Sequence, residues 1–111
     1  MFLYIELWKP RAAWENLAAE QRQEFLSRLE PAARQMEKLG VELTGFAAYD
    51  GPVTGDAPYR YMAVWKMPNE GHIHMLDKAV RSEGWANYFD IVSTRGRIVP
   101  VTSLVEDMMK V

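Results

Sequence analysis

The sequence predicts an α+β fold of the ferredoxin-like type: a four-stranded antiparallel sheet, helices on one face, and elements in the order β, α, β, β, α, β. Three observations lead to this prediction. Residues 2–8 (FLYIELW) and 59–66 (YRYMAVWK) alternate aromatic and aliphatic side chains with a period of two, which is typical of strands. Residues 20–39 and 69–83 place apolar side chains at helical spacing. The length of 111 residues suits a single domain over residues 1–111.

The first half of the chain is divided by prolines. The strand at residues 2–8 ends at Lys9-Pro10, and Pro10 suits the first turn of a short helix over residues 11–18. The longer helical pattern over residues 20–39 contains Pro31, whose nitrogen cannot donate a backbone hydrogen bond. We therefore expect a kink at Pro31 or a break into two helices.

A hairpin with a long loop follows. Gly40 stands where a left-handed helix C-cap belongs, and residues 41–49 have the composition of a strand. Residues 50–58 (DGPVTGDAP) are dense in turn-forming types, so they predict a loop before the strand at residues 59–67.

The last third of the chain predicts a helix, a strand and an appendage. Asn69 can cap a helix that ends at Gly84, and residues 88–94 read as the fourth strand. Arg95-Gly96-Arg97 predicts a bulge or turn. Residues 100–111 form a C-terminal appendage, for which a short amphipathic helix is favoured over a strand. We expect its Val105, Met108 and Met109 to pack against a partner subunit.

Right-handed crossovers place the first and third strands side by side at the centre of the sheet. Paired antiparallel with Glu6 near Ala63, they share a face that carries one carboxylate among aromatic rings. This face comprises Tyr4, Glu6, Trp8, Tyr61 and Trp65. The opposite face is aliphatic. An aromatic face that carries a carboxylate suits a ligand pocket or a subunit contact.

Composition excludes several classes of function. The formal net charge is -2 and there is no basic run, so a nucleic-acid partner is not expected. We expect no signal peptide and no membrane span, and the absence of cysteine fits a cytoplasmic protein without disulfides or thiolate metal ligands. No HExxH, GxSxG, GxGxxG or P-loop motif is present, so no cofactor and no metal site are predicted.

Glu6 is the candidate catalytic residue. A carboxylate in the middle of a central strand is costly to bury, so a buried Glu6 would have a raised pKa and could act as a general base. Arg95 or Arg60 could supply a counter-charge, and Arg95 and His72 are further candidates for the lining of the ligand pocket. The alternative is an acid that faces solvent or a subunit interface and pairs with an arginine.

The aromatic residues of the same face, Tyr4, Trp8, Tyr61 and Trp65, are candidates for a wall that stacks on a planar organic ligand. The alternative is the buried centre of a homodimer. His72 and His74 lie about 200° apart on a helix and cannot share one metal ion. His72 could be a single haem ligand or a base if it faces the sheet, whereas a structural role in the first helical turn is favoured.

The segments FLYIELW, YRYMAVWKMP, Gly84-Trp85 and Tyr88 to Asp90 (YFD) resemble a small bacterial family of unknown function within the dimeric α+β-barrel superfamily. The resemblance covers nearly the whole chain. It implies two ferredoxin-like subunits packed sheet against sheet, with the helices outside. The superfamily includes cofactor-free monooxygenases, lactone isomerases, haem-dependent chlorite dismutases and small stress-associated proteins, so the fold does not determine the reaction.

Together these inferences predict a cytoplasmic homodimer that binds a small aromatic molecule in a pocket between sheet and helices. If the protein is an enzyme, proton abstraction by Glu6 is expected, as in a cofactor-independent monooxygenase or an isomerase. The alternative is a non-catalytic homodimer whose aromatic sheet face is the subunit interface.

Overall fold

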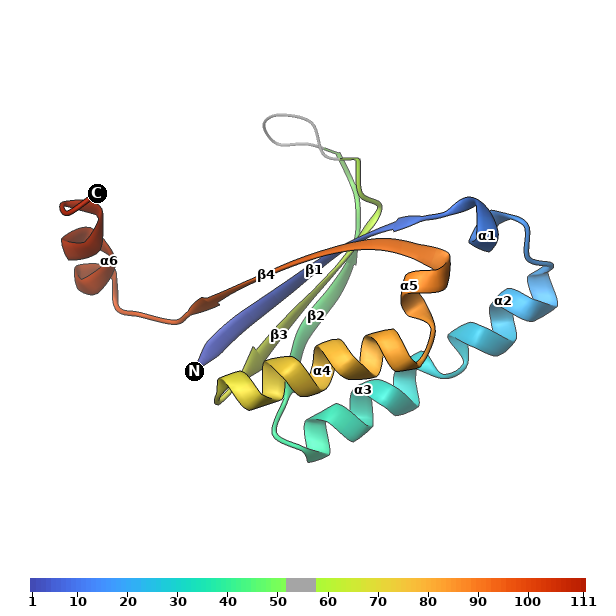
Figure 1. Ribbon diagram of the computed structural model, residues 1–111, viewed down its shortest axis with the longest axis horizontal. Coiled ribbons are helices and arrows are strands. Elements are labelled where there is room, and N and C mark those ends of the chain that lie inside the picture. Colours follow the sequence, from blue (N-terminus) through green and yellow to red (C-terminus); the bar gives the residue numbers. More distant parts are fainter. Residues whose placement is uncertain (52–57) are drawn as a thin grey trace.

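A computed structural model describes residues 1–51 and 58–111 (Figure 1). Most of the predicted loop at residues 50–58 therefore lies outside the described residues. The strands are β1 (Phe2–Pro10), β2 (Glu42–Ala48), β3 (Tyr61–Met67) and β4 (Phe89–Arg97). The helices are α1 (Ala12–Glu15), α2 (Ala19–Leu26), α3 (Leu29–Lys38), α4 (Glu70–Ser82), α5 (Trp85–Tyr88) and α6 (Val101–Met108).

The described strands form one antiparallel sheet in the order β2-β3-β1-β4. The predicted ferredoxin-like fold is confirmed, and β1 and β3 occupy the centre as expected. The predicted register is also correct, because Glu6 pairs with Ala63. Tyr4 consequently lies opposite Trp65, and Trp8 lies opposite Tyr61.

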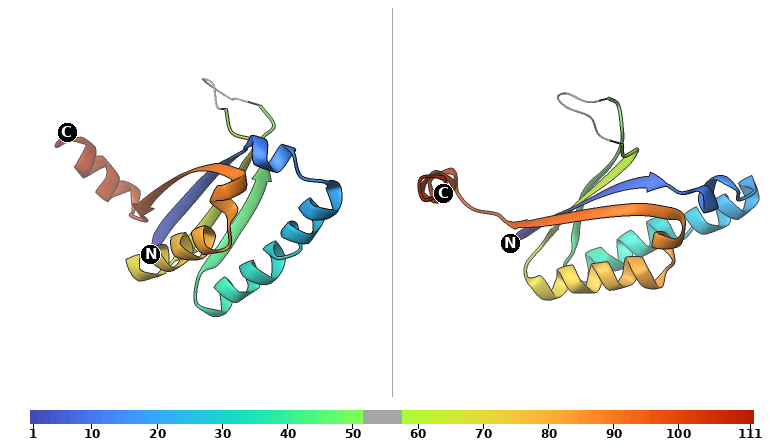
Figure 2. Two further views of the ribbon diagram at one scale, coloured as in Figure 1. Left: turned by 45° about the vertical axis from the view of Figure 1, so that its right-hand side comes forward. Right: turned by 45° about the horizontal axis from the view of Figure 1, so that its top comes forward.

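The helices α3 and α4 cover one face of this sheet, as Figure 2 shows. The covered face is the aromatic one: Tyr4, Glu6, Trp8 and Trp65 are all buried. Burial within a single subunit corrects the alternative in which the aromatic face forms the subunit interface. Large aromatic side chains remove the most apolar area from water when the helices pack on them, so this face forms the core.

The opposite face of the sheet carries the aliphatic residues and is covered by no helix in the described part of the chain. Leu3, Ile5 and Leu7 on β1 are half-buried, whereas Met62 on β3 and Val92 on β4 are exposed. Both of these exposed residues pair with Leu7, so they form one apolar row across the sheet.

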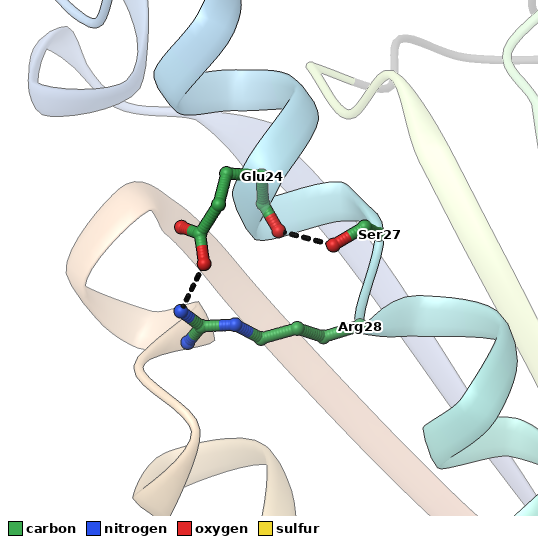
Figure 3. A network of polar contacts seen from close by, with 3 residues as sticks. All are labelled: Glu24, Ser27 and Arg28. Atoms are coloured by element: carbon green, nitrogen blue, oxygen red, sulfur yellow. Dashed lines mark hydrogen bonds and ion pairs between the residues drawn. The ribbon is translucent and has the colours of Figure 1, made fainter.

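The break predicted near Pro31 falls between α2 and α3. Figure 3 shows the polar contacts that accompany it: Ser27 Oγ donates to the Glu24 carbonyl oxygen at 2.5 Å, and Arg28 Nη2 pairs with Glu24 Oε1 at 2.8 Å. Pro31 is the third residue of α3. In the first turn its missing N–H costs no intrahelical hydrogen bond, so the helix restarts before the proline and needs no kink.

Several predicted boundaries differ from the structure. The third strand begins at Tyr61 rather than residue 59, and the first helix is a single turn, α1. The bulge or turn expected at residues 95–97 is wrong, because β4 runs regularly to Arg97 and Gly96 pairs with Leu3. The short helix α5 before β4 was not expected. Asn69 caps α4 as predicted, its Oδ1 accepting the His72 backbone N–H at 3.2 Å.

The core beneath the sheet has two parts. One is mixed, with Tyr4, Trp65 and Met67 packed against Ile73 and Leu76 of α4. The other is an aromatic cluster at the far end of β1, made of Trp8, Trp14, Phe25, Trp85 and Phe89. Gly84 precedes Trp85 at the start of α5 and has a φ of 87°, a left-handed conformation that glycine adopts without strain. The turn brings Trp85 within 5.1 Å of Trp8, measured between ring centroids.

At the opposite end of the sheet, β4 leads into α6 (Val101–Met108), which stands apart from the rest of the fold (Figures 1 and 2). Its predicted helical form is confirmed. No helix in the described part of the chain is long and apolar enough to cross a membrane.

Candidate functional site: a buried carboxyl group among tryptophans

Glu6 is the most unusual side chain in the covered layer, because its exposed fraction is only 1%. The strand alternation points it toward the helices, and the small Ala63 opposite leaves room for it. Its Oε1 accepts a hydrogen bond of 2.9 Å from Trp65 Nε1. Its Oε2 is buried with no hydrogen-bond partner among the described residues.

This environment changes the acidity of the group. Burial raises the pKa of Glu6 from 4.5 to about 7, because a charged carboxylate loses its hydration there. The indole N–H groups of Trp65 and Trp8 act in the opposite direction and lower the pKa, while the nearby charge of Asp77 raises it. The acid is therefore close to half ionised at neutral pH, which is the range in which a general base is most useful.

No arginine neutralises this acid within the part of the chain that the structure describes. Arg95 instead lies 3.9 Å from Glu70 at the start of α4, with both side chains partly exposed. Arg60 uses its backbone N–H to bond the Trp8 carbonyl at 2.9 Å. The counter-charge suggested by the sequence is therefore not found among the described residues, and the one hydrogen bond that the Glu6 carboxyl group accepts there comes from Trp65.

The Trp8 indole nitrogen is a second buried polar atom without a hydrogen-bond partner among the described residues. It lies close enough to the Glu6 carboxyl group to lower the pKa, although no hydrogen bond of normal geometry joins the two. One unpaired acceptor, Glu6 Oε2, and one unpaired donor, Trp8 Nε1, therefore occupy the same region of the core.

A small cavity of about 40 Å³ adjoins these atoms, with walls that include Glu6, Trp8, Trp65 and Trp85. A larger pocket of about 340 Å³ lies beside it toward the α2–α3 junction. The two share four wall residues, Trp8, Leu29, Phe46 and Trp85. The larger pocket is lined mostly by apolar atoms, and Glu6 lines only the smaller cavity beside it, so the carboxyl group adjoins an aromatic recess without forming part of its wall.

A third cavity, of about 210 Å³, reaches Glu6 from the β4 side. Its walls are polar and include Tyr4, Ser93, Asp77 and Arg81. Arg81 Nε binds Asp77 Oδ2 at 3.1 Å. Burial raises the pKa of the Tyr4 hydroxyl group, and the Ser93 hydroxyl group opposes that rise. Glu6 thus lies between an apolar recess and a polar cavity.

The five residues predicted to line one pocket are divided among these three spaces. Tyr4 and Glu6 line the polar cavity, while Glu6, Trp8 and Trp65 line the small cavity. Tyr61 lines the larger pocket and is 41% exposed, so it stands near the opening. The structure brings the predicted residues into one neighbourhood but does not place them around a single space.

His72 lies elsewhere. Its Nδ1 is 2.9 Å from Asn69 Oδ1, and its Nε2 is 2.9 Å from the Leu39 carbonyl oxygen. The ring joins the end of α3 to the start of α4, which is the structural role favoured by its position in the first turn. Ligation of a haem iron would break one of these contacts. No group of three or more His, Cys, Asp or Glu suited to a metal ion occurs among residues 1–51 and 58–111.

Sequence reasoning missed part of the aromatic wall. Trp14, Phe46, Trp85 and Phe89 line the larger pocket with Trp8. Phe46 and Trp8 have ring centroids 6.5 Å apart, and Trp8 and Phe89 have centroids 5.8 Å apart. Trp85 and the aromatic pair Tyr88-Phe89 are visible in the sequence, but nothing in their spacing indicates that they converge on Trp8.

The fold and this neighbourhood define a class: a small ferredoxin-like α+β protein with a buried, uncompensated carboxyl group beside an aromatic recess. The chain belongs to a family of unknown function, DUF6616, whose model matches residues 1–111. No protein of curated function matches the sequence.

Several solved structures share the fold. A dimeric ferredoxin-like protein of unknown function from Thermobifida fusca is 16% identical, with a TM-score of 0.57 and coverage of 87% of this chain and 90% of that chain. At3g17210 from Arabidopsis thaliana is 7% identical, with a TM-score of 0.57 and coverage of 90% and 97%. The VAO-type flavoprotein MtVAO713 from Myceliophthora thermophila is 20% identical, with a TM-score of 0.53; the match covers 86% of this chain but only 17% of the flavoprotein. These likenesses show the fold alone.

Proposed function

We propose that this protein binds a small hydroxylated aromatic molecule between the sheet and the helices, with Glu6 as the base that accepts a proton from it. The observation that carries the proposal is the pair of unpaired buried atoms, Glu6 Oε2 and Trp8 Nε1. One is an acceptor and the other a donor. A ligand hydroxyl group has both functions, so it could donate to the carboxylate and accept from the indole.

The size and lining of the spaces support the same ligand class. The cavity beside Glu6, at about 40 Å³, accepts a hydroxyl group but not a ring. The adjoining pocket of about 340 Å³ is large enough for one or two rings and is walled by tryptophan, tyrosine and phenylalanine. Aromatic side chains in tilted arrangements offer faces and edges on which a planar ligand can stack.

The chemistry follows from the acidity of Glu6. The ionised carboxylate takes the hydroxyl proton and becomes a neutral carboxylic acid, while the negative charge moves to the ligand oxygen. A neutral acid is the form that the buried position favours, and the Trp8 N–H can donate to the new oxyanion. The ligand anion could regain a proton at carbon, which is an isomerisation, or react with dioxygen, as in cofactor-independent oxygenation.

Quenching of tryptophan fluorescence by a panel of mono- and bicyclic phenols tests the proposal, because Trp8, Trp14 and Trp85 line the recess. We expect saturable binding to the wild type. Glu6→Gln should bind phenols at least tenfold more weakly at pH 8 and should abolish any turnover. Glu42→Gln, on the exposed start of β2, is the matched control and should bind normally. Absence of saturable binding to the wild type across the panel would reject the ligand pocket.

We also propose that two copies associate through the open face of the sheet. That face is apolar along Leu3, Ile5 and Leu7, and water contact with such a surface is unfavourable. The Thermobifida fusca protein of similar fold is itself described as dimeric. A cytoplasmic location, the absence of a nucleic-acid partner and a single domain over residues 1–111 remain predictions from the sequence.

A further inference from the structure

We infer that α6 is an arm exchanged between two copies of this chain, its apolar stripe packing on the open sheet face of the second copy over the row Met62, Leu7 and Val92. The inference rests on the proposed homodimer and adds the contact that completes it. Two surfaces of the same chain, one convex and one flat, are both apolar and both exposed.

The first surface is α6 itself. Val101, Leu104, Val105 and Met108 recur at intervals of three and four residues, so they form one stripe along the helix. Their exposed fractions lie between 49% and 75%. A free eight-residue helix is marginal in water, and most helical stability in proteins comes from packing an apolar face. Packing of this stripe on another apolar surface would therefore stabilise α6.

The second surface is the apolar row on the open face. Met62 and Val92 flank Leu7 on the neighbouring strands, with exposed fractions of 36% and 48%. This row lies toward the end of the sheet where β1 leads into α1. The α6 end of the sheet is the other one, where Phe2 pairs with Arg97. Met62 also lines the aromatic pocket, so a partner helix here would adjoin the proposed ligand site.

The arm cannot reach this row within its own subunit. Arg97 and Val92 are separated by about 17 Å along β4, at roughly 3.3 Å per residue. Beyond Arg97 the chain continues away from the sheet, and the Ile98 backbone N–H is held by the Met1 carbonyl oxygen at 2.9 Å. Figure 1 and the right-hand view of Figure 2 show α6 beyond the N-terminal end of β1. In the proposed exchange, a second copy that faces the first with its strands reversed would bring its own α6 over the row.

The area of the sheet face supports this occupant. Four strands about 4.8 Å apart, paired over seven residues of roughly 3.3 Å each, cover a flat projected area of about 450 Å², before the relief of the side chains is counted. A stable interface buries about 800 Å² of accessible surface on each partner. A face of this size contributes part of such an interface, and an exchanged helix adds contact on both sides of a two-fold axis. Closed two-fold symmetry also covers both arms and both rows at once, leaving no unpartnered apolar surface for a third copy.

Cysteine cross-linking tests the exchange directly, because the chain has no cysteine of its own. The double variants Leu104→Cys/Val92→Cys and Leu104→Cys/Met62→Cys are oxidised mildly and run on denaturing gels. We expect a covalent dimer from at least one of them, formed only when both cysteines are present. The matched control is Ser103→Cys/Val92→Cys, because Ser103 lies on the opposite side of α6 from the stripe. An equal yield from this control would overturn the inference.

Sedimentation velocity of the full chain separates the two proposals. A monomeric wild type would reject the dimer and the exchange together. A dimeric wild type without cross-links from either Leu104 variant would reject the exchange and leave the dimer in place. As a second measurement, Leu104→Asp/Met108→Asp should weaken dimerisation at least tenfold with an unchanged circular dichroism spectrum, whereas Ser103→Asp should not. Unchanged dimerisation in the first variant would also overturn the exchange.

Discussion

The burial of Glu6 makes the stability of this protein depend on pH in an unusual direction. An acid whose folded-state pKa lies above its unfolded value binds more protons when folded, so stability falls as pH rises between the two values. The pKa of Glu6 is about 7 in the folded protein, and its ordinary value is 4.5. The loss of stability begins near pH 4.5, proceeds through neutral pH and is complete above pH 7.

The magnitude follows from the two pKa values. Each unit of difference between the two pKa values corresponds to about 1.4 kcal/mol of folding free energy. The full loss of stability is therefore about 3 kcal/mol. Between pH 5 and pH 8 we expect about 2 to 3 kcal/mol of this loss. Glu6 is 1% exposed, so solvent screening reduces the effect little. A loss of this size is a large share of the stability of a small domain.

Glu6→Gln isolates this contribution, because the amide cannot ionise and its oxygen can still accept from Trp65 Nε1. Urea unfolding at pH 5, 6, 7 and 8, at one protein concentration, gives the free energy of unfolding for each variant. The stability of the wild type relative to Glu6→Gln should fall by about 2 to 3 kcal/mol across this range. The constant cost of an amide in the pocket cancels in the comparison between pH values. Glu42→Gln, at an exposed position, should track the wild type.

The reasoning would be refuted if the free energies of unfolding of the wild type and Glu6→Gln differed by the same amount at every pH from 5 to 8. It would mean that the carboxyl group has the same pKa in the folded and unfolded chain. Titration of the Glu6 side-chain carbon by NMR provides an independent check, with a midpoint expected near pH 7.

Three further outcomes follow from the same layer. Trp65→Phe removes the donor to Glu6 Oε1, so the pKa of Glu6 should rise further and the free energy of unfolding should fall by about 1 to 3 kcal/mol, measured by NMR titration and urea unfolding. Trp8→Phe removes an indole N–H that has no hydrogen-bond partner among the described residues, so phenol affinity should drop about tenfold, and the smaller ring leaves a gap in the aromatic cluster that should lower the free energy of unfolding by about 1 to 3 kcal/mol; an unchanged affinity would contradict the role given to Trp8. Leu76→Ala opens a cavity beneath the sheet and should cost about 2 to 5 kcal/mol in urea unfolding at any pH, unlike Glu6→Gln.

Much of the fold could be predicted because it rests on local patterns. The alternation in β1 and β3, the apolar spacing of α4 and the cap at Asn69 each act within a few residues. The pairing of Glu6 with Ala63 followed from the order of elements and the handedness of the crossovers. The errors arose where tertiary context prevails: Gly96 keeps regular pairing because β1 supplies its partner Leu3.

The candidate site was less predictable. Period-two alternation shows which side chains share a face, but it does not show which face the helices cover, since both faces carry apolar groups. The recess depends on Trp14, Trp85 and Phe89, which come from elements distant from Trp8 in sequence. Their convergence is a property of packing and has no signature in the spacing of any one segment.

For this protein, the sequence alone determined the order of elements, the central pairing of β1 and β3, and the presence of a carboxylate on an aromatic face. Only the tertiary structure decided that this face lies under the helices, that no arginine pairs with Glu6 among the described residues, that no helix of that part of the chain covers the aliphatic face, and that α6 is exposed. The physical reason is that some interactions act between neighbours along the chain, whereas others act between elements far apart in sequence. Backbone geometry and capping are decided by neighbours along the chain, whereas burial and the acidity of a carboxyl group depend on every element that excludes water from it.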